Sequence, residues 1–154
     1  MQKFQSAHEI LDFAIAEEAG AVAFYRDLAG KMERETMRRV FEGFAQEEER
    51  HHAKLLAVKA GETPLIAERQ ATDLKIGDYL IDIDPAAKPG ELDYQQALII
   101  AMKKEKAAFK LYTRLAEETP DAAYRAIFLG LAQEEAKHKL RFELEYDEEF
   151  LTEI

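Results

Sequence analysis

Two segments of the chain carry a glutamate followed three residues later by a histidine. The pattern occurs at Glu48 and His51 and again at Glu135 and His138. On an α-helix, residues three apart lie on one face about one turn apart, so a carboxylate oxygen and an imidazole nitrogen can reach the same point. Oxygen and nitrogen ligands without sulfur suit iron, manganese or zinc. One such pair is common on helix surfaces, but two of them indicate a metal site.

The two patterns belong to an internal repeat of the sequence. A shift that places Glu48 on Glu135 needs no gap and aligns further residues of the same type: Leu11 with Leu98, Glu18 with Glu105, Tyr25 with Tyr112, AQEE at 45–48 with AQEE at 132–135, and His51 with His138. Amphipathic helices share apolar patterns by chance, but this does not explain coincident Glu, Tyr and His residues. The repeat therefore selects Glu48 and His51 as the functional pair, in preference to Glu49 and His52.

Apolar periodicity independently places these residues on the inner faces of helices. Four stripes recur at steps of three and four residues: Leu11, Ala14, Glu18, Ala21, Tyr25 and Leu28; Phe41, Phe44, Glu48, His51, Leu55 and Val58; Leu98, Ala101, Glu105, Ala108, Tyr112 and Leu115; and Phe128, Leu131, Glu135, His138 and Phe142. This spacing is one continuous face of an α-helix. Glu49 and His52 fall about 100° round the helix and are predicted on its flank.

The stripes require long helices, which we predict at residues 7–31, 35–60, 94–118 and 120–148. Sequence signals for helix ends lie at the borders of these segments. The predicted caps are Ser6 with Glu9 in a capping box, Gly61 after the second helix, Asp93 before the third, and Thr119 followed by Pro120 at the start of the fourth.

Short loops join the first helix to the second and the third to the fourth, so each pair is predicted as an antiparallel hairpin. The first hairpin covers about residues 7–60 and the second about residues 93–148. Residues 61–92 contain three of the four prolines and are too long for a simple turn, so they are predicted as a crossover. The chain, residues 1–154, is therefore predicted to be a single all-α domain, a four-helix bundle of two hairpins.

Carboxylates from all four helices would meet in the middle of this bundle, at Glu18, Glu48, Glu105 and Glu135. Burying even one uncompensated ion costs several kcal/mol, while a whole domain is stable by only roughly 5–15 kcal/mol. The stripes contain no Lys or Arg at this level, but two divalent cations would balance the four charges. Tyr25 and Tyr112 lie two turns beyond their glutamates. Their hydroxyls are predicted to orient the metal ligands through hydrogen bonds.

Charge and composition exclude other classes of function. The net charge of −10 argues against nucleic acid and anionic membranes as partners, and no apolar run is long enough to span a bilayer. The absence of cysteine excludes disulfides, zinc–thiolate sites and iron–sulfur centres. The N-terminal MQKFQSAHEI lacks the apolar region of a secretion signal, so a cytoplasmic protein is expected.

Four stretches of the sequence together resemble the rubrerythrin-type diiron domain of the ferritin-like superfamily: EEAGAVAFYRDLA, FAQEEERHHAKLL, EKAAFKLYTRLA and LAQEEAKHKL. The likeness covers nearly the whole chain and implies a ferritin-like bundle that binds two iron ions, with manganese or zinc as alternative metals. It also implies a role for each of six metal ligands: Glu48 and Glu135 bridging the metals, Glu18 with His51 at one end, and Glu105 with His138 at the other.

Two features depart from the rubrerythrin pattern. Rubrerythrins proper carry a rubredoxin domain with a four-cysteine iron centre, and this chain has no cysteine. They also carry a further glutamate on the third helix, one turn after the ligand, where this chain has Ala108. Turnover as a peroxidase would therefore need an external electron donor, such as a rubredoxin-like protein.

The resemblance implies a diiron-carboxylate oxidoreductase that oxidises ferrous iron with peroxide or dioxygen, as in rubrerythrin-like peroxide detoxification. Two alternatives stay open: a ferroxidase that handles iron, and a metal-stabilised interaction protein without redox turnover. The expected partners are peroxide or dioxygen, the external electron donor and a second copy of the chain in a homodimer. Neither nucleic acid nor a membrane is expected as a partner.

Overall fold

The structure is a computed structural model that describes residues 6–61 and 93–151. These residues form four α-helices of 25 residues each: α1 (Ala7–Lys31), α2 (Glu35–Lys59), α3 (Tyr94–Glu118) and α4 (Ala122–Tyr146). A short π-helix, η1 (Asp147–Leu151), continues α4. Every helix end lies within two residues of the predicted one. The predicted crossover, apart from Gly61, lies outside the described residues.

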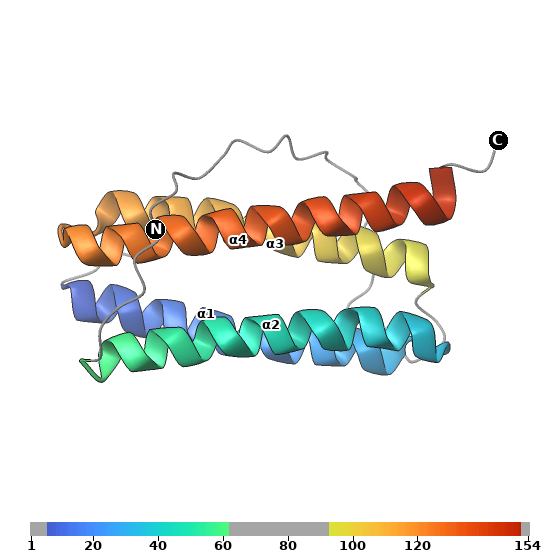
Figure 1. The fold of residues 1–154 in the computed structure, drawn as a ribbon, viewed down its shortest axis with the longest axis horizontal. Helices are drawn as coiled ribbons and strands as arrows, with labels where there is room; N and C mark the ends of the chain where they lie inside the picture. The colour runs from blue at the N-terminus through green and yellow to red at the C-terminus, as the bar shows by residue number, and fades with distance from the viewer. Residues whose placement is uncertain (1–5, 62–92, 152–154) are drawn as a thin grey trace.

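The helices pair as predicted, α1 with α2 and α3 with α4. Each pair is an antiparallel hairpin, and the two hairpins lie side by side along the long axis of the molecule (Figure 1). This arrangement confirms the predicted all-α four-helix bundle. Within the described residues, no helix has the length of apolar sequence that crosses a membrane.

Polar side chains begin α1 and α3 at the predicted residues. The Ser6 hydroxyl accepts a hydrogen bond from the Glu9 amide at 3.2 Å, and Asp93 Oδ1 accepts one from the Gln96 amide at 2.8 Å. Each cap satisfies an amide that has no partner within its own helix. Gly61 follows α2 with a φ of +87°, a left-handed conformation that glycine adopts without strain. The predicted caps Ser6 and Asp93 are therefore confirmed, whereas the C-cap of α2 is Ala60 and Gly61 is the residue after it.

The start of α4 differs from the prediction. Thr119 is not its N-cap, because it ends α3 and its amide still bonds within that helix. Asp121 takes the N-cap position, and its Oδ1 accepts hydrogen bonds from the amides of Ala123 and Tyr124 at 2.9 and 3.1 Å. The prediction placed Pro120 inside the helix. An aspartate directly after the proline can cap two amides, so the helix begins two residues later.

The core consists of two apolar clusters with a charged layer between them. The Phe142 cluster comprises Tyr25, Leu28, Ala29, Met32, Phe41, Phe44, Ala45, Tyr94, Ala97, Leu98, Ile99, Ala101, Met102, Phe142 and Tyr146. The Phe128 cluster comprises Ile10, Leu11, Ala14, Leu55, Val58, Tyr112, Leu115, Ala116, Ile127, Phe128, Leu131 and Ala132. Along every helix, the stretch between the two clusters carries one of the predicted carboxylates. These four form the acid layer: Glu18, Glu48, Glu105 and Glu135.

Candidate metal centre

The six predicted metal ligands are all buried at mid-height in the bundle. Their exposed fractions are 1% for Glu18, 0% for Glu48, 5% for His51, 1% for Glu105, 2% for Glu135 and 1% for His138. Because each helix buries the face that carries its apolar stripe, these polar side chains are buried with it. The predicted inward orientation is therefore confirmed for all six.

The six residues form two overlapping groups, each with candidate ligand atoms within 4.8 Å of one another. We call them the His51 position, made of Glu18, Glu48, His51 and Glu135, and the His138 position, made of Glu48, Glu105, Glu135 and His138. Glu48 and Glu135 belong to both groups. Two metals held in these groups would share the carboxylates of Glu48 and Glu135.

Half of the side-chain polar atoms in these groups have no hydrogen-bond partner. Six buried atoms lack a hydrogen bond within the described part of the chain: Glu18 Oε2, Glu48 Oε1 and Oε2, His51 Nδ1, Glu105 Oε2 and Glu135 Oε1. Leaving one such atom buried without a partner costs about 1–3 kcal/mol, and more if it is charged. Carboxylate oxygens and imidazole nitrogens bind divalent metals. The donor set therefore fits a two-metal centre.

Both histidines turn the same ring nitrogen, Nδ1, toward the carboxylates. His51 Nδ1 lies 3.2 Å from Glu48 Oε1 and 3.5 Å from Glu135 Oε1. His138 Nδ1 lies 3.3 Å from Glu105 Oε1 and 3.5 Å from the Oε1 atoms of Glu48 and Glu135. The two rings stack nearly parallel, with centroids 5.7 Å apart and planes 8° from parallel. Each ring thus offers one nitrogen to its own position.

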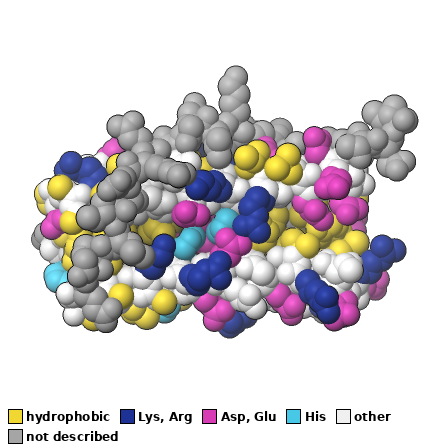
Figure 2. All heavy atoms as spheres, in the orientation of Figure 1, with side chains coloured by type: hydrophobic (Ala, Val, Ile, Leu, Met, Phe, Trp, Pro, Cys, Tyr) yellow, Lys and Arg dark blue, Asp and Glu magenta, His cyan; other side chains and the backbone are white. Residues whose placement is uncertain are grey.

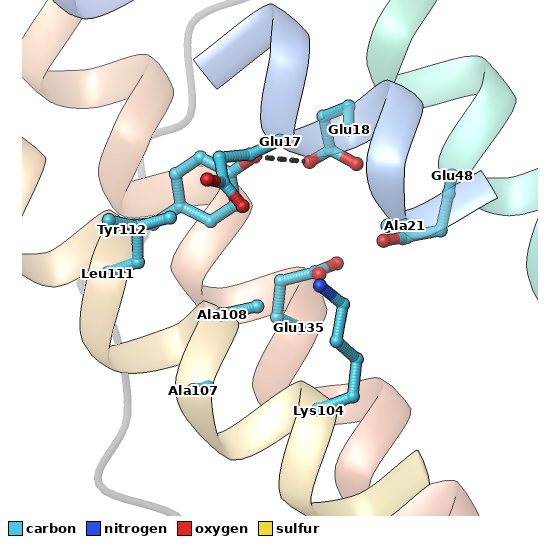
Figure 3. Close-up of a pocket in the computed structure, with 10 residues that line it drawn as sticks. All are labelled: Glu17, Glu18, Ala21, Glu48, Lys104, Ala107, Ala108, Leu111, Tyr112 and Glu135. Atoms are coloured by element: carbon cyan, nitrogen blue, oxygen red, sulfur yellow. Dashed lines mark hydrogen bonds between the residues drawn. The ribbon is translucent and has the colours of Figure 1, made fainter. Parts of the chain in front are cut away.

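Two tyrosines reach across from the facing helix to the outer carboxylate of each position. The Tyr25 hydroxyl donates to Glu105 Oε1 at 2.5 Å, and the Tyr112 hydroxyl donates to Glu18 Oε1 at 2.7 Å (the latter is the dashed line in Figure 3). Burial, followed by the nearby carboxylates, raises the pKa of both hydroxyls well above 10, so both stay protonated donors. Each bond occupies Oε1 and leaves Oε2, the oxygen without a partner, free for a metal.

The four buried carboxylates of the acid layer cannot all stay ionised without cations to balance their charge. Burial, and then the charges of the three neighbouring glutamates, raises the pKa of Glu135 well above 4.5. Burial also raises the pKa of Glu18, against hydrogen bonds that lower it. The metal-free centre therefore holds protons at carboxylates that would otherwise be charged. Two divalent cations would replace these protons and balance four carboxylates.

Both candidate histidine ligands also bind protons more tightly than usual. Burial alone would lower the pKa of His51, but Glu18 and Glu48 outweigh burial and raise the pKa to about 9. Burial alone would also lower the pKa of His138, but hydrogen bonds to Glu105 and Glu47 outweigh burial and raise this pKa to about 10. A metal that binds Nδ1 must therefore displace a proton from each ring.

A cavity of about 80 Å³ adjoins the acid layer between α1 and α3. The carboxylates of Glu18, Glu48 and Glu135 line it, and the small side chains of Ala21, Ala107 and Ala108 leave it open (Figure 3). Lys104 extends from α3 toward these carboxylates. One water molecule needs about 10–15 Å³ of volume measured in this way. The cavity therefore has room for a small molecule directly beside the candidate ligands.

Two charged residues near the centre were missed by the sequence analysis. Glu47 is half-buried and lies 3.1 Å from Nε2 of His138; this hydrogen bond and Arg141 lower the pKa of Glu47 to about 2. Lys139 is only 1% exposed and donates from Nζ to Glu143 at 2.5 Å. No local signal marks either residue, since Glu47 meets a residue 91 positions away and Lys139 lies beside the apolar stripe.

The residues predicted on the flank lie there. The Glu49 side chain is 46% exposed and pairs with Arg26 at 2.7 Å across the first hairpin. His52 is only partly buried and belongs to neither ligand group. The choice of Glu48 and His51 over their neighbours therefore agrees with the geometry.

The rubrerythrin family profile matches residues 9–146, a span that includes all six candidate ligands. Among solved structures, a hypothetical protein from Pyrococcus furiosus is 26% identical and superposes with a TM-score of 0.62, covering 93% of this chain and 89% of its own. A comparison with curated protein sequences finds no match. Because the family match extends over most of its length, the chain belongs to the rubrerythrin family.

Proposed function

We propose that this protein is a diiron-carboxylate oxidoreductase that oxidises ferrous iron with peroxide or dioxygen, as in peroxide detoxification. The observation that carries the proposal is the set of buried, unpartnered oxygen and nitrogen atoms in two overlapping groups. Such a set is unfavourable without cations. Membership of the rubrerythrin family supports iron as the metal, with manganese and zinc as alternatives.

The iron would supply the redox chemistry: two ferrous ions give one electron each, enough to reduce one peroxide to two waters with two protons. The protein's part is to position and balance the charges. Glu48 and Glu135, which both positions share, can contact both metals. Tyr25 and Tyr112 hold the outer carboxylates by one oxygen and so fix where the other points.

The cavity beside the acid layer is the proposed place where the oxidant approaches. Its volume admits a molecule of the size of peroxide or dioxygen, and its alanines add no bulk. Glu17 and Lys104 also line it, and both are only partly buried. They offer groups that can exchange with solvent the protons that peroxide reduction consumes.

Repeated turnover needs electrons from outside these residues. The 154 residues contain no cysteine, so they hold no thiolate-bound iron that could pass electrons to the centre. We propose a separate donor, such as a rubredoxin-like protein. The predicted homodimer and the cytoplasmic location stay predictions, the first of which light scattering can test.

The test begins with metal-free protein loaded anaerobically with Fe²⁺, followed by a count of bound iron per chain. One equivalent of peroxide is then added, and the ferrous and ferric fractions are measured by Mössbauer spectroscopy. We expect two irons per chain, both oxidised by one peroxide, and a faster reaction with peroxide than with dioxygen in stopped flow. Steady turnover is expected once a reduced rubredoxin is supplied.

Other outcomes would replace the proposal by one of the alternatives. Uptake of many irons per chain, with dioxygen as the faster oxidant, would identify an iron-handling ferroxidase. Bound ferrous iron that peroxide leaves unchanged, together with full thermal stabilisation by zinc, would identify a metal-stabilised interaction protein. As a control, Glu49→Ala removes a carboxylate next to Glu48 and is expected to behave as wild type, since Glu49 belongs to neither position.

A further inference from the structure

The two ring nitrogens of His138 have different partners. Nδ1 faces the carboxylates of the centre, and Nε2 on the far side of the ring lies 3.1 Å from Glu47 Oε1. Arg141 pairs with Glu47, and a carboxylate paired in this way only accepts, so Nε2 donates this hydrogen bond to Oε1. The lone pair of the neutral ring is then on Nδ1, the nitrogen offered to a metal. Glu47 thereby fixes both the tautomer and the orientation of His138.

Glu47 is itself held in place from α4. Its second oxygen, Oε2, accepts a hydrogen bond from Arg141 Nη1 at 2.7 Å. The guanidinium of Arg141 also lies 4.4 Å from the centroid of the Phe44 ring, and Phe44 packs edge-to-face on His138 at 5.1 Å. The four residues form a closed set of contacts between α2 and α4. On the face that these helices turn to the viewer, histidine, acidic and basic side chains gather near the middle of the long axis (Figure 2).

The internal repeat supplies a natural comparison for this set. Around His51, the aligned residues are Glu134 for Glu47, Lys54 for Arg141 and Leu131 for Phe44. Every ion pair found for His51 in the described part of the chain uses Nδ1, and none joins its ring to Glu134. Lysine lacks the planar fork that bonds a carboxylate and stacks on a ring at once, and leucine offers no ring to stack on.

We propose that Glu47, held by Arg141, makes the His138 position the tighter of the two metal positions and the first to fill. A carboxylate that accepts the far N–H of a metal-binding histidine fixes the ring and makes the ligand nitrogen more basic, and its loss typically lowers metal affinity about 10–100-fold. Glu47 acts as a positioning residue, since it belongs to neither ligand group. The inference uses the metal centre of the proposed function but not its redox chemistry.

The test is an anaerobic titration of the metal-free full chain with Co²⁺ against a competing chelator, followed by visible absorption. We expect two binding steps in the wild type, separated by about 10–100-fold in affinity. Glu47→Ala is expected to weaken only the tighter step by about tenfold or more, and Arg141→Lys, which copies the repeat, to weaken it less. The matched variants Glu134→Ala and Lys54→Arg are expected to leave both steps unchanged.

Single-position variants assign the effect to one half of the centre. In a His51→Ala background the chain keeps the His138 position, and Glu47→Ala is expected to weaken Co²⁺ binding about 10–100-fold. In a His138→Ala background the same substitution is expected to change nothing. Nitrogen-15 spectra of the zinc-loaded protein should show the Nε2–H tautomer for His138, with a shifted Nε2 resonance in Glu47→Ala. Loss of packing alone would not move that resonance.

Several results would overturn the inference. Two equal binding steps in the wild type would do so, as would a Glu47→Ala effect of the same size in both backgrounds. An effect of Glu134→Ala equal to that of Glu47→Ala would also exclude it. A chain that binds no Co²⁺ overturns this inference and the metal centre together. A chain that fills stepwise but whose iron does not react overturns the proposed function alone.

Discussion

The His138 position and the His51 position contain the same kinds of candidate ligand in different surroundings. Each takes one histidine by Nδ1, one outer glutamate held by a tyrosine and the two shared glutamates. Behind the histidine the two differ, because His138 donates to Glu47 and His51 has no such bond among the described residues. Repetition of the sequence therefore preserves the candidate ligands and their tyrosines, but not the contacts behind the histidine.

The largest expected effect comes from removing what the two positions share. Glu48→Ala deletes a candidate ligand of both, so we expect bound metal to fall from about two ions per chain to well below one. Glu18→Ala touches the His51 position alone and should leave about one ion bound. Metal analysis after gel filtration measures both. If Glu18→Ala empties the chain, the two positions do not bind separately.

Metal removal is expected to make folding stability strongly dependent on pH. The folded pKa values of His51 and His138, about 9 and about 10, exceed the ordinary value of 6.5. The folded chain therefore binds more protons than the unfolded chain, so this contribution is complete below pH 6.5 and is lost as pH rises toward 10. We expect the Tm of the chelator-treated protein to fall by roughly 5–10 °C over that window.

Metal-loaded protein is the control for this pH dependence. Bound metal replaces the ring protons, so its Tm should change little over the same range or rise from pH 6.5 upward. Thermal unfolding followed by circular dichroism measures both forms. An equally flat profile in the chelator-treated protein would show that the histidines do not hold these protons.

The tyrosines allow each position to be weakened by the same chemical change. Tyr25→Phe removes the hydrogen bond to Glu105 and should weaken the His138 position, whereas Tyr112→Phe frees Glu18 and should weaken the His51 position. A lost bond to a charged group is worth about 1.5–3 kcal/mol, or roughly tenfold or more in affinity. Co²⁺ titration measures each step. An equal loss at both positions from either variant would contradict this separation.

The smallest effect on metal binding is expected from the Arg26–Glu49 ion pair, a difference between the two hairpins that lies outside the candidate centre. The Arg26–Glu49 ion pair has no equivalent in the second hairpin, where Thr113 and Ala136 align with its residues. Both of its side chains are largely exposed, and pairs of this kind contribute at most about 1 kcal/mol. Arg26→Ala should leave metal binding unchanged and shift the urea midpoint only slightly. A clear loss of metal would mean that this face supports the centre.

The buried placement of the candidate ligands could be predicted from sequence because it is a local property of each helix. A step of three or four residues fixes which face a side chain shares, and burial of the apolar residues on that face carries Glu48 and His51 inward. The repeat then distinguishes these residues from Glu49 and His52. Helix ends were equally predictable where a single polar residue stood at the border, as at Ser6.

What could not be predicted depends on contacts between distant helices. Glu47 looks like a flank residue in its own helix, and its role appears only when α4 brings His138 and Arg141 beside it. The predicted start of α4 was wrong for a local reason. Thr119 and Asp121 are both good caps, and a sequence rule cannot rank them. The cavity beside Ala108 likewise depends on how closely the helices approach one another.

The acid layer also affects the order in which the two ends of the bundle unfold. It separates the Phe142 cluster, with six buried aromatic rings, from the Phe128 cluster, with two. Aromatic side chains bury the most apolar area, so the Phe128 end is the weaker of the two. Without metal, the acid layer couples the two clusters only weakly. Amide hydrogen exchange should then be faster at the Phe128 end than at the Phe142 end. Cations bound across all four helices would couple the two ends into one cooperative unit.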